Sequence, residues 1–472
     1  MWAAWAAYLS ILLGALLLGL DGIDRSLWLD EAWVANSVHE PTLGGMFYYP
    51  EWLQTSPPLF LLIARLLTHL IGFNTTSLRL ISLIFAIIAA AGFLAVLRRV
   101  VTAPVALLAA VLLVFHPLPV EYFRSFKQYG AEMAATAMFL LASVVNLQFP
   151  GRREFLWLLL TTLLVPLSYP LVFLLPGMIL AVWFSDRVRA AVLAGAGAVV
   201  MGILYVLFIR PNVAPALWTY WRDNAQPDNS LIAIVAAAAV YAIWRRREWI
   251  MLICLLPCAL LVLAEVSGWY PASPRARLFV RPCLLLALAI PVNDLVVRMT
   301  GRWKRAHVAV TLAAVAVMGW GLSKQFTERR GEPQEDYSMA IRLLRARLMP
   351  GDLVLVHPSA REGFRLYTEI ENWHPAVIYG DTGWPCCPRS HSAGPRSSTE
   401  VAVRQDLNAK IPPAADHFWL LLNNRPSHWR YASVDETVLW PRLLAERGCV
   451  VAERAYPANL VTIKMVCSSN SP

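Results

Sequence analysis

The chain has 472 residues, of which 58% are hydrophobic and 15% are charged, and its formal net charge at pH 7 is +10. A soluble chain has about 25% charged residues, so this composition excludes an ordinary soluble protein and favours one that crosses a membrane many times. The basic excess does not call for nucleic acid, because lysine and arginine gather in the cytoplasmic loops of membrane proteins. We therefore expect the lipid bilayer, and no nucleic acid, as a partner.

Apolar runs long enough to span a bilayer, about 20 residues, or nearly so, recur along the first two thirds of the chain. The first, 2–20, lacks a basic segment before it and a small-residue cleavage pattern after it, so we expect a retained span rather than a signal peptide. The run 155–184 contains "PLSYPLVF" and is predicted to form two short spans that turn near 168–170. The other runs are 79–97, 101–118, 130–149, 190–209, 230–244, 249–266, 279–297 and 306–322.

The positive-inside rule fixes the expected topology. The stretch 56–72 carries Arg65 and His69 and is read as a juxtamembrane helix at the outer face rather than a span. An inner N-terminus and eleven spans then place all basic clusters inside, at 98–99, 152–154, 186–189, 245–248 and 298–305. The sequence thus predicts a polytopic α-helical membrane protein, with outer loops at 21–78, 119–129, 210–229 and 267–280.

After the last run the apolar stretches shorten to strand length. They are "DLVLVHP", "AVIYG", "HFWLLLNN", "CVVAERAY" and "LVTIKMV", and helical patterns such as "YSMAIRLLRARL" and "WPRLLAERG" lie among them. This alternation predicts a transmembrane domain at 1–323 and an outer α/β domain at 324–472 with a mainly parallel sheet. A hairpin around "YPAN" would set Cys449 opposite Cys467, either as a disulfide or as two free thiols. The stretch 381–400 is read as a loop.

Two adjacent acids in the first outer loop are the first candidates for chemistry. In "SLWLDEAWVA", Asp30 and Glu31 are flanked by Trp28 and Trp33. The structural alternative is that the acids cap the helix that follows. Tryptophans favour the membrane interface and would hold the pair beside a lipid-borne substrate, where a carboxylate can act as a general base. We favour the functional interpretation.

Two further outer segments carry cations that oppose the positive-inside bias. In "EYFRSFKQYGAE", a helix would put Arg124, Lys127 and Gln128 on one face, with Glu132 one turn beyond Gln128. In "YPASPRARLFVRPC", three arginines on the outer side of the membrane require a counter-charge. The guanidinium group of arginine can make a bidentate contact with a phosphate group. The predicted substrate-binding residues are Lys127, Gln128, Tyr129, Glu132, Arg275, Arg277 and Arg281.

Structural alternatives exist for each segment. The cations of the 121–132 segment could be snorkelling side chains, and the arginines could pair with Asp30 or Glu132. In "QTSPPLF", Gln54 and Ser56 are read as parts of a structural turn. A metal site built from Asp30, Glu31 and Glu132 is a minor alternative.

Taken in chain order, "SLWLDEAWVA", "SPPLFLLI", "SLRLISLIFAII", "EYFRSFKQYGAE" and "LFVRPCLLLALAIP" resemble a GT-C-type polyprenyl-phosphate-sugar glycosyltransferase. The resemblance covers about residues 1–300. Within this class, the sequence resembles most the bacterial branch akin to the rhizobial lipopolysaccharide-core transferases. Protein O-mannosyltransferases and aminoarabinose transferases are more distant relatives.

The resemblance implies a periplasm-facing donor, a sugar on a polyprenyl phosphate, and an acceptor in the cell envelope. It implies Asp30 as the base of an inverting transfer with Glu31 beside it, Lys127 near the donor phosphate, and Arg281 at the late span. No cofactor and no metal are expected. The rival interpretations are a lipid-linked sugar flippase and a non-catalytic envelope protein. A flippase would line a path with charges on both leaflets, whereas here the unusual charges gather on the outer side.

Overall fold

The computed structural model describes residues 2–51, 54–213, 222, 229–245, 248–271, 273–300, 305–328, 335–380, 399–412, 417–423, 436–457 and 459–467. The chain forms two compact units. We call them the helical unit (Met1–Ile23, Thr55–Leu67 and Leu78–Arg330) and the mixed unit (Asp24–Gln54, Thr68–Ser77 and Gly331–Pro472). Most of the predicted loops at 210–229 and 381–400, and parts of the basic clusters at 245–248 and 298–305, lie outside the described residues.

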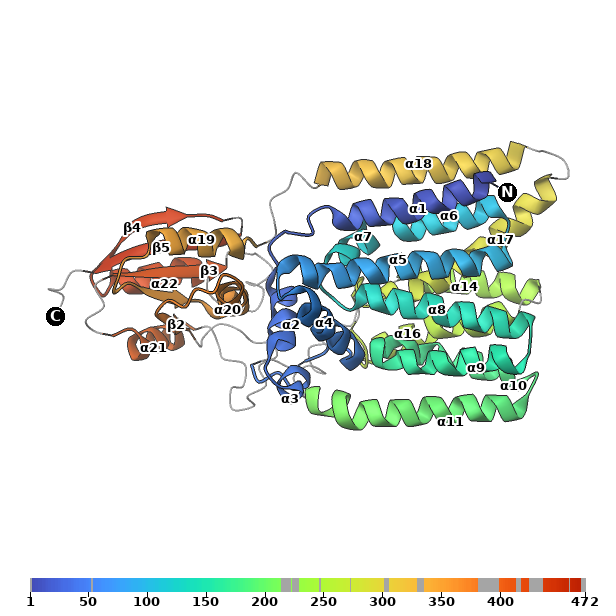
Figure 1. The fold of residues 1–472 in the computed structure, drawn as a ribbon, viewed down its shortest axis with the longest axis horizontal. Coiled ribbons are helices and arrows are strands. Elements are labelled where there is room, and N and C mark those ends of the chain that lie inside the picture. The colour runs from blue at the N-terminus through green and yellow to red at the C-terminus, as the bar shows by residue number, and fades with distance from the viewer. Residues whose placement is uncertain are drawn as a thin grey trace. The chain divides into compact units, whose positions relative to one another are not determined.

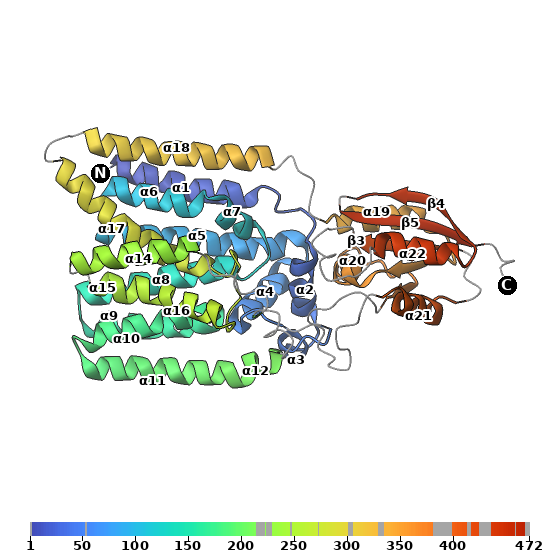
Figure 2. The same cartoon turned by 180° about the vertical axis from the view of Figure 1, so that it is seen from behind.

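The helical unit is a set of long apolar helices that run side by side (Figures 1 and 2). The elements are α1 (Trp2–Leu20), α4 (Pro58–Ile71), α5 (Thr75–Val100), α6 (Ala103–Val114), α7 (Pro117–Arg124), α8 (Tyr129–Gln148), α9 (Arg152–Thr161), α10 (Leu175–Trp183), α11 (Arg187–Leu204), α12 (Arg210–Asn212), α14 (Asn229–Trp244), α15 (Glu248–Ile250), α16 (Leu256–Val266), α17 (Arg281–Thr300) and α18 (Arg305–Glu328). The C-terminal end of α4 and the N-terminal end of α5, within Thr68–Ser77, belong to the mixed unit.

Short irregular turns interrupt these helices. Two 3₁₀ turns, η1 (Thr162–Leu167) and η2 (Tyr169–Phe173), separate α9 from α10, with Ser168 between them, where the sequence predicts a turn. The remaining turns are η3 (Tyr205–Ile209), η4 (Met251–Leu255) and η5 (Leu278–Val280). Prolines lie inside η1 and η2, and one is the second residue after each of η3, η4 and η5. Proline favours such breaks because it cannot donate the backbone hydrogen bond that continues a helix.

Four helical segments of the described chain are long and apolar enough to cross a membrane: Thr75–Val100, Tyr129–Gln148, Arg187–Asn212 and Leu278–Met299. The pair α6 and α7, bent by 57°, makes a fifth if it is counted as one span. Large apolar side chains such as Val199 and Ile203 of α11 are exposed on the protein surface, as lipid-facing residues are. The predicted count of eleven spans stays a prediction.

Close helix packing inside the unit depends on Gly177 of α10. A Cβ atom at this position would lie 1.7 Å from the backbone carbonyl oxygen of Leu252 in η4. Small residues allow such close backbone approach between membrane helices. Gly195 of α11, by contrast, has nothing within 4 Å of an added Cβ.

We therefore expect Gly177→Ala to lower the thermal unfolding temperature of the detergent-solubilised protein, because the added methyl group forces α10 and η4 apart. Overpacking of this kind costs about 1–3 kcal/mol. Gly195→Ala is the matched control, and it should leave the unfolding temperature unchanged or slightly higher, since alanine favours a helix over glycine. Equal unfolding temperatures for the two variants would contradict the close contact.

The mixed unit contains a five-stranded sheet in the order β2-β1-β3-β5-β4. The strands are β1 (Leu353–Val356), β2 (Val377–Tyr379), β3 (His417–Asn423), β4 (Cys449–Ala455) and β5 (Leu460–Cys467), all at predicted places. The helices are α2 (Leu29–His39), α3 (Leu43–Phe47), α19 (Tyr337–Arg347), α20 (Arg361–Ile370), α21 (Glu400–Lys410) and α22 (Glu436–Ala445), with the 3₁₀ turn η6 (Pro358–Ala360).

The predicted mainly parallel sheet is wrong. β1 pairs in parallel with β2 and β3, but β5 pairs antiparallel with both β3 and β4. The predicted β4–β5 hairpin is the reason, because its second strand returns into the sheet beside β3. The hairpin sets Cys449 directly opposite Cys467, and the two form a disulfide.

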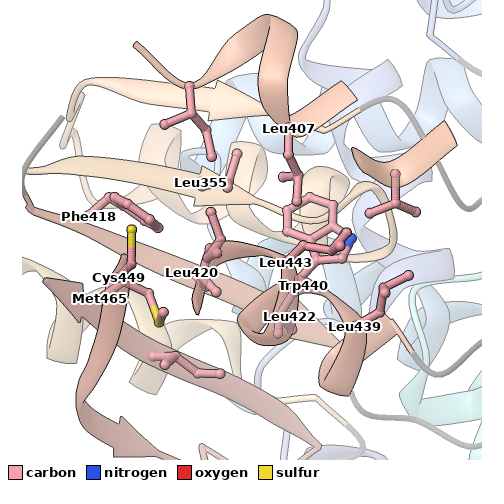
Figure 3. Close-up of a cluster of buried hydrophobic side chains, with 14 of the residues drawn as sticks. Leu355, Leu407, Phe418, Leu420, Leu422, Leu439, Trp440, Leu443, Cys449 and Met465 are labelled. Atoms are coloured by element: carbon pink, nitrogen blue, oxygen red, sulfur yellow. The ribbon is translucent and has the colours of Figure 1, made fainter. Parts of the chain in front are cut away.

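The core on one face of the sheet lies beneath α21 and α22 (Figure 3). Alternate β3 residues Phe418, Leu420 and Leu422 point into it, where they meet Leu407 of α21 and Trp440 of α22. Trp419 and Leu421 are also fully buried. Strands buried on both faces have continuous apolar sequences, which explains the unbroken run "FWLLL" in β3.

Candidate functional site

The helix that carries Asp30 and Glu31 begins at Leu29. Both acids lie in its first turn, where the helix dipole favours negative charge. Glu31 is fully buried, and its Oε2 accepts the backbone N–H of Trp28 at 3.2 Å, which is one half of a capping box. Asp30 is half-buried. The predicted capping role therefore applies to Glu31, and the catalytic roles of both acids stay predictions.

The mixed unit holds this helix by contacts more than 300 residues apart in sequence. The buried backbone N–H of Leu29 donates to Glu335 Oε2 at 2.9 Å, and the N–H of Leu27 donates to the Tyr367 hydroxyl at 2.7 Å. Burial raises the pKa of Tyr337 well above its usual value, and the Glu335 carboxylate beside it raises the pKa further. The Glu335 side chain, from the C-terminal segment, thus caps the first turn of α2.

A second set of contacts fixes the middle of α2. The Asn36 side chain donates to the backbone oxygen of Glu362 at 2.9 Å and to its Oε2 at 2.8 Å. The Tyr49 hydroxyl donates to the same Oε2 at 2.8 Å. Asn36, Tyr49 and Glu362 are all buried. The segment 24–54 therefore packs with the C-terminal α/β fold as one compact unit. The domain division at 323/324 stays a prediction.

We expect Glu335→Ala to loosen the first turn of α2, because it leaves the buried Leu29 N–H without its acceptor at a cost of about 1–3 kcal/mol. Hydrogen exchange of the α2 backbone amides should become faster. Glu335→Gln keeps an acceptor oxygen and should restore slow exchange. Glu446→Ala, which removes a surface partner of Arg404, is the control and should leave exchange in α2 unchanged. Fast exchange in the glutamine variant as well would contradict the capping role.

The segment 121–132 is not one continuous helix, and the predicted shared face of Arg124, Lys127 and Gln128 is wrong. α7 ends at Arg124 and α8 begins at Tyr129, so the residues between them form a turn. Ser82 of α5 donates to the Ser125 carbonyl oxygen at 2.7 Å, and this tertiary contact replaces a helical bond. Glu132 nevertheless lies one turn beyond Gln128, because its N–H donates to the Gln128 carbonyl oxygen at 2.9 Å.

The 125–128 turn meets the "SPP" segment. The Ser56 hydroxyl donates to Gln128 Oε1 at 3.4 Å, and the ring centroids of Phe60 and Phe126 are 5.7 Å apart. Lys127 is buried. Two motifs that lie about 70 residues apart in sequence are therefore brought together within the helical unit.

Glu132 and Tyr270 lie close enough to interact electrostatically, and the sequence prediction included only Glu132. Glu132 is buried, and its Oε2 has no hydrogen-bond partner among the described residues. Burial raises the pKa of Tyr270 well above its usual value, and the charges of Glu132, Tyr129 and Glu265 raise it further. Tyr270 is therefore a neutral phenol, and it donates to the Ala276 carbonyl oxygen at 3.1 Å. The feature of the sequence that could have pointed to Tyr270 is its position as the first residue of the segment "YPASPRARLFVRPC".

The three late arginines have different surroundings. Arg277 forms a two-pronged ion pair with the buried Glu265, with Nε–Oε1 at 2.7 Å and Nη2–Oε2 at 2.9 Å. Glu265 is thus a counter-charge for Arg277 that the sequence prediction missed. Arg275 lies half-buried in the turn before η5. Arg281, the first residue of α17, has no acid within ion-pairing distance in the described part of the chain.

Arg281 lines a cavity of about 300 Å³ within the helical unit. His116 also lines it, and Nδ1 of His116 accepts the Leu118 N–H at 3.2 Å, so the neutral ring has its proton on Nε2. Arg277 lines the cavity with its charge already compensated. The other lining residues are Leu112, Ser230, Leu231, Ile234, Pro274, Val280, Leu284, Leu285 and Leu288. The described lining of the cavity is thus mostly apolar, and within it Arg281 is the one cation without an acid partner.

The predicted site residues fall into both compact units. Asp30 and Glu31 lie in the mixed unit, and all seven predicted substrate-binding residues lie in the helical unit. The cavity brings Arg277 and Arg281 together, whereas Lys127 is not among its lining residues. In the part of the chain that the structure describes, no three His, Cys, Asp or Glu side chains are grouped to hold a metal ion.

The fold defines a helical membrane protein with an α/β domain, and solved structures share it. ArnT from Cupriavidus metallidurans bound to undecaprenyl phosphate is 12% identical in sequence, with a TM-score of 0.58 over 98% of this chain and 99% of that chain. The apo state of the same ArnT is 12% identical, with a TM-score of 0.61 over 98% of each chain. The fold is therefore an ArnT-like GT-C fold.

A family model described as dolichyl-phosphate-mannose-protein mannosyltransferase matches residues 55–218. This region includes the "SPP" segment and the 125–128 turn. No curated protein matches the chain. The resemblance to the rhizobial lipopolysaccharide-core branch stays a prediction.

Proposed function

We propose that this chain is a membrane glycosyltransferase that moves a sugar from a polyprenyl-phosphate donor to an acceptor in the cell envelope. The observation that carries the proposal is the apolar cavity with Arg281 as its uncompensated cation. A polyprenyl phosphate has the matching chemistry, since its hydrocarbon chain suits leucine walls and its phosphate suits a guanidinium group. The GT-C fold and the mannosyltransferase match at residues 55–218 support the same class.

The proposed mechanism is a single inverting displacement. Asp30 takes the proton of the acceptor hydroxyl as its oxygen attacks the anomeric carbon of the sugar. The bond between that carbon and the phosphate oxygen breaks on the opposite face, and the electron pair leaves with the polyprenyl phosphate. Arg281 and Lys127 stabilise the charge that develops on the phosphate in a site of low dielectric. Within this account Glu31 supports the helix that carries the base.

Four further predicted residues receive roles in the same account. Gln128, Tyr129 and Glu132 contact the sugar, and Arg277 acts through its ion pair with Glu265 to shape the cavity wall. A monophosphate leaving group needs fewer counter-charges than a diphosphate, so the mechanism uses no metal. The N-terminus is proposed to lie in the cytoplasm and the mixed unit outside the inner membrane, in agreement with the positive-inside rule.

Mass spectrometry of envelope glycolipids from cells with and without the protein tests the proposal. We expect cells without it to accumulate one polyprenyl-phosphate sugar and to lack that sugar on one envelope component. The lost component identifies the acceptor, and the accumulated lipid identifies the donor. If the protein were a flippase, cells without it would instead keep the lipid-linked sugar on the cytoplasmic side of the membrane, where a membrane-impermeant probe cannot reach it. An unchanged glycolipid profile would contradict both the proposed glycosyltransferase and the alternative of a flippase.

A further inference from the structure

A second pocket in the helical unit lies apart from the cavity that contains Arg281. Its volume is about 460 Å³, and it is formed where α5 and α8 end, beside α15 and α17. Basic residues gather at the ends of these helices, Arg98 and Arg99 on α5 among them. Among the residues that the structure describes, the two pockets share none in their linings. Nothing in the proposed transfer reaction uses this second pocket.

Two of the described side chains that line the pocket, Arg99 and Asn293, can donate hydrogen bonds, and a third, Gln148, donates its Nε2 group to the Arg99 carbonyl oxygen at 3.2 Å. Oδ1 of Asn293 accepts both the N–H and the hydroxyl of Thr102, each at 2.8 Å. Both contacts fix the amide, so its Nδ2 group is left as a donor without a partner among the described residues. Arg99 likewise has no acid within ion-pairing distance in the described part of the chain. A fixed amide donor and an uncompensated guanidinium favour an anion.

Among the described lining residues Asp294 is the one acid, and its charge is already compensated. The Tyr241 hydroxyl donates to Asp294 Oδ2 at 2.7 Å, and Nη2 of Arg245 lies 3.3 Å from the same oxygen. Asp294 therefore does not cancel the positive potential of Arg99. The remaining walls are apolar, with Val144 and Ile290 among them.

We propose that this pocket binds the phosphate of an anionic phospholipid, with the head group on Arg99 and Asn293 and the upper acyl chain along Val144 and Ile290. The apolar walls and the position at the ends of membrane-length helices favour a lipid over a soluble phosphate. Trp249 also lines the pocket, and tryptophan favours the membrane interface. The inference is independent of the proposed sugar transfer, because it concerns a different pocket and a different ligand.

The test is native mass spectrometry of the full-length protein titrated with phosphatidylglycerol and, separately, with phosphatidylcholine of the same acyl chains. We expect preferential binding of phosphatidylglycerol, and we expect Arg99→Gln to weaken it about tenfold, as loss of a charge-assisted hydrogen bond does. Arg98→Gln is the matched control, since it removes the same charge one residue away. Its guanidinium lies over the Tyr8 ring, 5.3 Å from the centroid, and does not line the pocket.

Asn293→Asp is the second variant. It keeps an acceptor for Thr102 but replaces the Nδ2 donor with a negative oxygen, so it should weaken phosphatidylglycerol binding even if Arg99→Gln does not fold. Equal weakening by Arg98→Gln would show general charge attraction and overturn the site. Equal binding of the two lipids would overturn it as well. Competition by glycerol 3-phosphate or inorganic phosphate at the lipid's own concentration would overturn the assignment to a lipid.

Discussion

Asp30→Asn is expected to reduce sugar transfer by about 10²- to 10⁴-fold, the contribution of a positioned general base. Asparagine has nearly the same shape as aspartate but cannot take the proton of the acceptor hydroxyl. The start of α2 is held by Glu335, which accepts the Leu29 N–H, and its middle by Glu362, which accepts from the Asn36 side chain. Neither contact is removed by the substitution. The variant should therefore fold and bind the lipid donor as the natural protein does, and the loss should appear in kcat.

The measurement is the initial rate of transfer by the purified variant, together with donor affinity. Asp24→Asn is the control, because Asp24 is an exposed acid in the same segment and should keep the full rate. A rate for Asp30→Asn within a few-fold of the natural protein would remove Asp30 from the base role. Loss of donor binding in the same variant would assign Asp30 to the donor site instead.

Arg281→Gln is expected to weaken the binding of polyprenyl phosphate by about 10- to 100-fold, since a hydrogen bond to a charged group contributes about 1.5–3 kcal/mol. Arg281 has no acid partner among the described residues, so its removal leaves no buried carboxylate unpaired. The unfolding temperature should therefore change little. Arg281→Lys keeps the charge without the planar fork and should retain part of the affinity.

Arg298→Gln is the matched control for this prediction, because Arg298 lies in the last turn of the same helix. Its polyprenyl-phosphate affinity should equal that of the natural protein. Arg277→Gln should behave differently, because it strands the buried Glu265 carboxylate, and breaking such a pair is strongly destabilising. An unchanged affinity in Arg281→Gln would contradict the assignment of the cavity to the donor phosphate.

The sequence predicts the local elements well, because apolar length and periodicity decide them. The strand-length runs of the tail all form strands, and the proline-rich centre of 155–184 breaks into turns. The helical interpretation of 121–132 fails because Ser82 from another helix takes the Ser125 carbonyl. A contact that crosses 43 residues leaves no periodic signal in the sequence.

The site is harder to predict than the fold, because its partners are set by tertiary contacts. The candidates Arg275, Arg277 and Arg281 are equivalent by composition, and only the Glu265 ion pair separates Arg277 from Arg281. The association of α2 with Glu335 and Glu362 likewise joins segments more than 300 residues apart. Such pairings follow from the complete fold, and no local pattern encodes them.

The most direct test of the account is transfer by the purified protein in detergent, supplied with the polyprenyl-phosphate sugar identified from the envelope and with its acceptor. We predict one polyprenyl phosphate released for each sugar transferred, and a product whose anomeric configuration is opposite to that of the donor. Asp30→Asn in the same assay should form both products about 10²- to 10⁴-fold more slowly. Transfer with retained configuration, or a natural protein that binds the donor and releases nothing, would contradict the account.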